Sequence, residues 1–155
     1  MEIYLLRPAG SDPTLPGAHR FLPLDARQVI RAIGTKIRLT EEPSFDRVFT
    51  SPHPYAVQTA ELFADRTDYV GVIEVLPLLA SADAPPSVIA PTLLERGQRV
   101  LVVADEPALS ALGAFLVGRP TFPPAMPGQI SVIKNREPQW CLRPGEIGRQ
   151  LLLVA

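Results

Sequence analysis

The chain has 155 residues, of which 46% are apolar and 20% charged, and its formal net charge is −1. This balance predicts one soluble globular domain over residues 1–155 and excludes a disordered chain or a strongly basic nucleic-acid-binding surface. No apolar run approaches the roughly 18 residues of a membrane-spanning helix, and no secretory leader is present, so we expect a cytoplasmic protein. The single cysteine, Cys141, predicts no disulfide.

The first half of the chain alternates between strand and helix patterns. A continuous apolar run predicts a buried strand over 2–6, and the long loop that follows is a candidate functional loop. Apolar residues at helical spacing from Ala26 to Ile37 predict an amphipathic helix. A strand over 46–50 and a helix over 54–64 come next.

The alternation continues in the second half. We expect a strand over 70–76, a helix over 86–96 that Pro91 begins or kinks, and the cleanest buried strand over 99–104. A helix over 107–117 follows, and then a hairpin of strands 129–134 and 138–142. This order predicts an α/β fold: a three-layer α/β/α sandwich with a mostly parallel central sheet and an antiparallel edge hairpin.

Three predicted strands end in polar or turn-forming residues. These ends are Arg7-Pro8-Ala9, the stretch from Ser51 to Tyr55, and Ala104-Asp105-Glu106-Pro107. In an open α/β sheet, ligands bind beyond the carboxyl ends of the parallel strands. Any chemistry is therefore expected to involve these three segments.

The same segments resemble the histidine phosphatase superfamily, and within it the small SixA-like phosphohistidine phosphatases, over nearly the whole chain. Members of that group have Arg-His-Gly after the first strand, where this chain has Arg7-Pro8-Ala9. Their Ser-Pro turn and Arg-Ala-x-Gln-Thr-Ala helix start correspond to residues 51–60. Their Glu-Val-Leu-Pro-Glu and Val-Val-Gly-His-Glu-Pro-x-Leu-Ser stretches resemble residues 74–78 and 102–110.

The departures from this pattern fall on the residues that the resemblance makes catalytic. In the family, the first-strand histidine is the nucleophile, and two arginines and a second histidine surround the phosphate. This chain has Pro8 at the nucleophile position, Tyr55 at that of the second arginine and Asp105 at that of the second histidine, so only Arg7 is retained. The resemblance thus implies a vestigial phosphate pocket formed by Arg7, Pro8, Ser51, Tyr55 and Asp105.

The substituted residues are unsuited to phosphoryl transfer. Proline offers no attacking atom, because its nitrogen belongs to the backbone amide. Lowering the barrier to phosphoryl transfer requires converging positive charge, about +3 to +4 in the family's pocket, whereas Arg7 and Asp105 sum to zero. Two unit charges about 4 Å apart interact by about 4 kcal/mol at an effective dielectric constant of about 20, so Asp105 opposes phosphate about as strongly as Arg7 attracts it.

Other roles for these residues remain open. His53 and His19 are candidates for relocated catalysis, although neither has an acid at a recognisable spacing, and surface histidines are the simpler interpretation. Asp105 is expected either to cap the following helix or to form an ion pair with Arg7 in the former phosphate position. Tyr55 is expected either to pack over a closed pocket or to line a remodelled ligand cleft with Arg7 and Ser51.

These observations predict a catalytically inactive SixA-like pseudophosphatase that acts as a binding, scaffolding or regulatory module, conceivably in phosphorelay signalling. The alternative is an active phosphatase with relocated catalytic residues or a remodelled pocket for small anions. We expect no cofactor and no metal, and we expect a protein partner rather than a nucleic acid or a membrane. The chain is expected to be a monomer or a homodimer. Ile130, Val132 and Ile133 or the segment 151–154 are candidate contact surfaces, although packing in the core or by the last element is the simpler interpretation.

Overall fold

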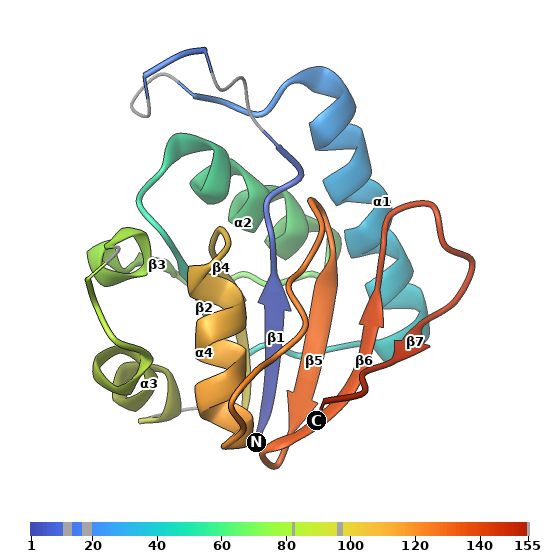
Figure 1. Cartoon of the computed structure of the whole chain (residues 1–155). Helices are drawn as coiled ribbons and strands as arrows, with labels where there is room; N and C mark the ends of the chain where they lie inside the picture. The colour runs from blue at the N-terminus through green and yellow to red at the C-terminus, as the bar shows by residue number, and fades with distance from the viewer. Residues whose placement is uncertain (11–13, 17–19, 82, 96–97, 155) are drawn as a thin grey trace.

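The computed structural model describes residues 1–10, 14–16, 20–81, 83–95 and 98–154. Its strands form one seven-stranded sheet in the order β3-β2-β4-β1-β5-β6-β7 (Figure 1). The strands are β1 (Glu2–Leu6), β2 (Arg47–Thr50), β3 (Ile73–Val75), β4 (Arg99–Val103), β5 (Ile130–Lys134), β6 (Glu137–Leu142) and β7 (Gln150–Leu151). The first four pair in parallel, and β5, β6 and β7 extend the sheet in antiparallel fashion from β1.

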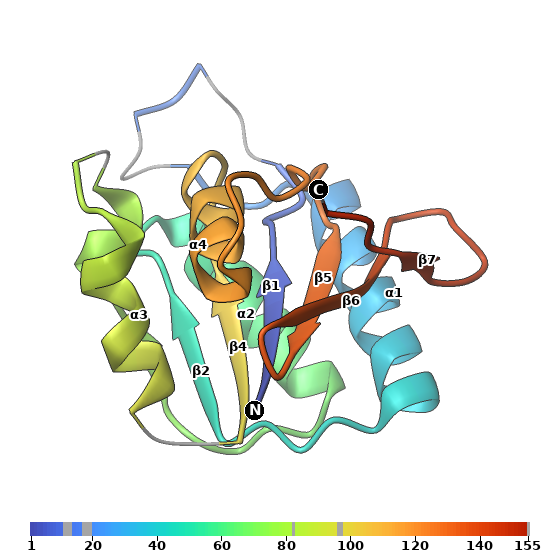
Figure 2. The same ribbon diagram turned by 60° about the horizontal axis from the view of Figure 1, so that its bottom comes forward.

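Four α-helices cover the two faces of this sheet. Helices α1 (Leu24–Glu41) and α2 (Pro54–Arg66) pack on one face, while α3 (Pro86–Leu94) and α4 (Ala108–Val117) pack on the other (Figures 1 and 2). A 3-10 helix, η2 (Pro77–Ala80), follows β3. The predicted three-layer α/β/α sandwich is confirmed, and the sequence pattern gave no sign of η2 and β7.

The core is divided by the sheet because its central strands are apolar on both faces. In β4, Val100 and Val102 belong to the cluster beneath α3 and α4, whereas Leu101 and Val103 belong to the cluster beneath α1 and α2. All four side chains are fully buried. A continuous apolar run is therefore the pattern that this central strand requires.

Several predicted boundaries change in the structure. The strand expected over 70–76 is limited to β3, because Val70 and Val72 are 99% and 76% exposed and lie outside it. Pro91 lies inside α3 rather than at its start. This helix ends at Leu94, and the predicted end at Arg96 lies outside the described residues.

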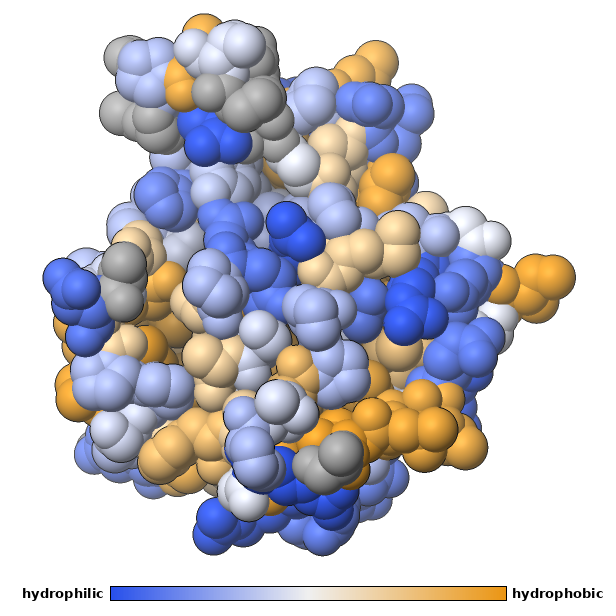
Figure 3. All heavy atoms as spheres, viewed as in Figure 1, coloured by the Kyte–Doolittle hydropathy of each residue, from blue (hydrophilic) through white to orange (hydrophobic). Residues whose placement is uncertain are grey.

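Of the two roles left open for the β5 residues, core packing is confirmed and a contact surface is not. Ile130, Val132 and Ile133 are buried, because β5 lies between β1 and β6 rather than at the edge of the sheet. The C-terminal segment differs, since Leu151 in β7 is 80% exposed and Leu153 is 84% exposed. Figure 3 shows an apolar area on this part of the surface.

The hairpin of β5 and β6 holds the only tryptophan of the chain. Asn135 and Arg136 join the two strands with φ values of 51° and 66°, which is the left-handed backbone of a tight hairpin turn. Trp140 in β6 and Tyr4 in β1 pack on the same face of the sheet, with ring centroids 6.3 Å apart in an edge-to-face arrangement. The Arg149 guanidinium lies 5.2 Å from the Trp140 ring centroid.

Among the described residues, no helix is long and apolar enough to cross a membrane.

Candidate functional site

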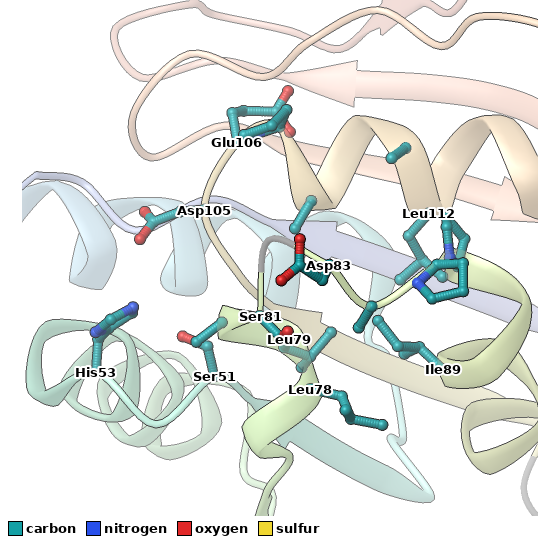
Figure 4. Close-up of a pocket in the computed structure, with 17 residues that line it drawn as sticks. Ser51, His53, Leu78, Leu79, Ser81, Asp83, Ile89, Asp105, Glu106 and Leu112 are labelled. Carbon is teal, nitrogen blue, oxygen red and sulfur yellow. The ribbon is translucent and has the colours of Figure 1, made fainter.

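Two cavities open where the parallel strands end, and they share the carboxylates of Asp105 and Glu106. The first, which we call the strand-end pocket, has a volume of about 350 Å³. It is lined by Arg7, Pro8, Gly10, Arg20, Tyr55, Asp105, Glu106 and Pro127. The second, which we call the apolar cavity, has a volume of about 510 Å³ and lies between the end of β2, the η2–α3 segment and the start of α4 (Figure 4).

Arg7 is held toward the β5 side of β1. Its backbone N–H donates to the Gln129 carbonyl at 3.0 Å, and its own carbonyl accepts from the Gly128 N–H at 3.0 Å. Its Nη1 donates to the Ala125 carbonyl at 2.6 Å. Gly128 has a φ of +80°, and a Cβ there would meet the Pro144 side chain at 2.8 Å, so the turn that fixes Arg7 requires glycine.

Asp105 takes a hydrogen bond from the other side of the pocket. The Tyr55 hydroxyl donates to Asp105 Oδ2, and Tyr55 is only 6% exposed. Burial, the hydrogen bond to Asp105 and the negative charge of that carboxylate raise the pKa of Tyr55. The start of α2 at Pro54 places this tyrosine over the end of β4.

The expected ion pair between Arg7 and Asp105 is wrong. The ion pairs of the described residues do not include it within 4.0 Å. The physical reason is that each side chain has another partner although β1 and β4 are neighbours: Arg7 Nη1 donates to the Ala125 carbonyl, and Asp105 accepts from Tyr55. Tyr55 is the partner of Asp105, and it lines an open pocket rather than closing it.

Arg20 is a pocket residue that the sequence did not single out. Its Cζ lies 5.3 Å from the centroid of the Tyr55 ring, a cation–π contact. Its Nε is buried and has no hydrogen-bond partner in the part of the chain that the structure describes. The only sequence signal was the length of the loop that carries it.

Glu106 has a structural role between the two cavities. One carboxylate oxygen accepts from the Ser110 N–H at 2.7 Å, and the other accepts from the Ala125 N–H at 2.9 Å. The first bond satisfies an amide in the opening turn of α4, which is the capping role expected for Asp105. Both oxygens of Glu106 are therefore engaged by the backbone.

The strand-end pocket has no net formal charge, because two guanidinium groups face two carboxylates. The side chain of Pro8 has no reactive atom, and Tyr55 is the only hydroxyl among the described residues that line the pocket. That hydroxyl already donates to Asp105, and its raised pKa keeps it protonated at neutral pH. Neither Pro8 nor Tyr55 is therefore an activated nucleophile in this pocket.

The remaining candidate residues lie in the apolar cavity or beyond the described chain. Ser51 and His53 line the apolar cavity and do not line the strand-end pocket (Figure 4). The His53 ring stacks on the Tyr55 ring, with centroids 5.3 Å apart and planes 4° from parallel. His19 lies outside the described residues. Within the described ranges, no group of three or more His, Cys, Asp and Glu residues is placed to hold a metal ion.

Comparisons with known proteins match the fold alone. No protein-family model matches the chain, and no curated protein matches it at a significant level. The protein histidine phosphatase SixA, solved in complex with tungstate, superposes with a TM-score of 0.80 at 21% identity, over 93% of this chain and 97% of that one. A protein of Agrobacterium tumefaciens described as a SixA phosphohistidine phosphatase gives 0.74 at 16% identity, over 92% and 97%.

A third solved structure extends the likeness beyond the SixA proteins. The alpha-ribazole phosphatase of Shigella flexneri superposes with a TM-score of 0.68 at 18% identity, over 98% of this chain and 96% of that chain. Both chains are covered almost completely in all three comparisons.

Proposed function

From its histidine phosphatase fold and its strand-end pocket, we infer that this chain is a pseudophosphatase. It keeps the architecture of the SixA-like enzymes and acts as a binding, scaffolding or regulatory module. One observation carries the proposal: the nucleophile position is Pro8, and the one hydroxyl among the described residues of the pocket, Tyr55, is bonded to Asp105. A covalent phosphoryl transfer needs an attacking atom that neither residue supplies.

The charge of the pocket supports the same conclusion. Phosphoryl transfer depends on donors and cations that converge on the transferred group. Here Arg7 donates to the Ala125 carbonyl, and the carboxylates of Asp105 and Glu106 lie in the same pocket. An incoming phosphate dianion would meet as many negative groups as positive ones.

A protein partner is the ligand that we propose for this module. SixA is a protein histidine phosphatase, so its substrate is itself a protein. We propose that this chain engages a phosphotransfer or response-regulator protein through the strand-end pocket without dephosphorylating it. Arg20 would contribute to such contacts, because its guanidinium lines the pocket beside the Tyr55 ring.

The absence of catalysis is tested with an aryl phosphate. We expect hydrolysis of p-nitrophenyl phosphate between about pH 5 and about pH 8 to remain at the rate of the protein-free blank, because neither Pro8 nor Tyr55 supplies a nucleophile. The His53→Ala variant is the matched control and is expected to give the same rate. Turnover by the unaltered chain that this variant loses would contradict the proposal.

Hydrolysis with His53 as a relocated nucleophile is the second candidate function. The observation in its favour is that His53 lines the apolar cavity together with Ser51 and Asp105. The assay above distinguishes the two functions, since only this one predicts a rate that depends on His53.

The binding role is tested by affinity capture on the immobilised chain. The Arg20→Glu variant is the comparison, because it reverses the charge of a guanidinium that lines the strand-end pocket. We expect partner proteins that use the strand-end pocket to be lost on this variant and retained on Arg31→Glu, which changes α1 instead. Equal capture by all three proteins would contradict a role for the pocket.

A further inference from the structure

We propose that the apolar cavity binds a small organic amine, protonated at neutral pH and carrying an alkyl or aryl group. This inference goes beyond the proposed function, and it holds whether or not the chain hydrolyses phosphate. It rests on the walls of the cavity, on its charge, and on a buried hydroxyl without a partner.

The walls are suited to an apolar body. A volume of about 510 Å³ lies within the roughly 300–1,000 Å³ typical of small-molecule sites. Leu78 comes from η2, Ile89 from α3 and Leu112 from α4, so three separate elements surround the space (Figure 4). The cavity is larger than a bound water molecule requires and is predominantly apolar.

The charge at the rim favours a cation. Asp83, Asp105 and Glu106 contribute three carboxylates, while His53 is the only basic side chain among the described residues that line the cavity. Arg7 and Arg20, which offset Asp105 and Glu106 in the strand-end pocket, do not line this cavity, so Asp83 leaves the described lining of the two cavities together with one net negative formal charge. Opposite charges near a protein surface attract by a few kcal/mol at about 4 Å, so a protonated amine is preferred over an anion of the same shape.

The helices that begin at this cavity offer little to an anion. Helix α3 starts with Pro86 after Pro85, and neither residue has an N–H group. In α4, the Ser110 amide already donates to Glu106. The backbone amides that often bind phosphate at helix starts are thus absent or occupied at these positions.

Ser51 supplies the specific polar contact. It is 1% exposed, it lines the cavity, and its Oγ has no hydrogen-bond partner within the described parts of the chain. An unpaired buried hydroxyl is costly, so a ligand that pairs with it gains binding free energy. The Oγ itself is buried, so Ser51 must turn toward the cavity to accept from an ammonium N–H. That contact would satisfy the hydroxyl and leave the positive charge near Asp105.

Three probes of matched shape test the proposal: phenethylamine, phenethyl alcohol and hydrocinnamate. Each is titrated into the uniformly ¹⁵N-labelled chain at neutral pH, and amide shifts are followed by two-dimensional NMR. We expect saturable shifts of Ala108 and Ala111, which line the cavity. The amine is expected to bind at least about tenfold more tightly than hydrocinnamate, with the alcohol between them.

Substitutions then assign the contacts. Ser51→Ala is expected to weaken the amine about fivefold, as loss of one hydrogen bond predicts. Asp83→Asn is expected to weaken it about twofold to fivefold, because Asp83 is exposed and partly screened, whereas Asp65→Asn on α2 is expected to change nothing.

Ala111→Phe fills the cavity from an exposed helix position and is expected to abolish amine binding. Its control, Ala32→Phe at an exposed position of α1, is expected to leave amine binding intact.

The design separates this proposal from the proposed function, because no arm measures hydrolysis. Equal affinity for the amine and hydrocinnamate, no saturable shifts with any probe, or unchanged amine binding by Ala111→Phe would each overturn it. Native-like spectra of the variants establish that they are folded.

Discussion

The two cavities at the strand ends share one edge of the sheet but differ in how their polar groups are satisfied. In the strand-end pocket, Arg7 donates to a backbone carbonyl and Tyr55 donates to Asp105, while Arg20 Nε is buried without a partner among the described residues. In the apolar cavity, the Ser51 hydroxyl is the buried polar group without a described partner. The fold brings the strand ends together in both cases, and the side chains decide whether the unpaired group is a cationic nitrogen or a neutral hydroxyl.

Aromatic stacking forms the wall between these cavities. The His53 ring, which lines the apolar cavity, stacks on the Tyr55 ring, which lines the strand-end pocket. Tyr55 in turn holds Asp105, whose carboxylate reaches both spaces. Changes to this wall are therefore the direct way to alter one cavity relative to the other.

The largest expected effect comes from reversing the charge of the strand-end pocket. The triple variant Pro8→His, Tyr55→Arg, Asp105→His makes the pocket more positive by about three to four charges when one or both histidines are protonated, so we expect it to bind tungstate at least about 100-fold more tightly than the unaltered chain. Isothermal titration calorimetry measures this difference. Pro8→His alone is the control and is expected to gain little, because Asp105 still opposes the anion. Equal affinities for all three proteins would show that charge does not limit anion binding here.

A smaller effect, on the free energy of unfolding, is expected from Glu106, whose carboxylate lines both cavities. Glu106→Ala removes the acceptor of two backbone amides, so we expect the free energy of unfolding to fall by about 3 kcal/mol. Urea denaturation measures this change. The exposed Glu95 gives the matched control, since Glu95→Ala is expected to alter stability by less than about 0.5 kcal/mol. If the two variants were equally stable, the proposed role of Glu106 as a brace would be contradicted.

The smallest expected effect on stability comes from Tyr55, one of the two stacked rings between the cavities, and it appears at alkaline pH. The pKa of Tyr55 is raised in the folded state, so above about pH 10 the unfolded chain releases a proton that the folded chain retains. The stabilisation from this raised pKa is complete below that pH and is lost as the pH rises. Between about pH 9 and about pH 11, we expect the free energy of unfolding to fall by about 1 kcal/mol less in Tyr55→Phe than in the unaltered chain.

Guanidinium chloride denaturation at the two pH values measures the difference. Burial raises the pKa of Tyr4 to about 12, but Tyr4 is present in both proteins and its contribution cancels in the comparison. Identical pH dependence would mean that Tyr55 titrates alike in the folded and unfolded chains.

The buried parallel strands are the part of the fold that the sequence predicts best. The run from Arg99 to Val103 must be apolar on both faces, and that requirement is visible without any tertiary information. The two-residue strand β7 is not predictable in this way. It is defined by its pairing with β6 through Trp140 and Cys141, and both of its own residues are exposed.

The candidate site shows the same division. The convergence of the strand ends follows from parallel pairing, so Arg7, Tyr55 and Asp105 line one pocket as residues at those ends should. The partner of each residue does not follow, because it depends on groups outside the strands. The Ala125 carbonyl, in the segment before β5, accepts from Arg7, and Tyr55 at the start of α2 donates to Asp105. Arg20 reaches the pocket from an irregular loop, and the sequence of such a loop has no periodic pattern that would indicate where its side chains point.

The packing of Trp140 makes its intrinsic fluorescence a signal of whether the sheet is folded. As the single tryptophan, it dominates the intrinsic fluorescence, and its ring is held between Tyr4 and Arg149 in the antiparallel part of the sheet. It lines neither cavity. Its emission should therefore follow the loss of sheet packing and remain silent to ligands at the strand ends, so that stability and occupancy are separate signals in one sample.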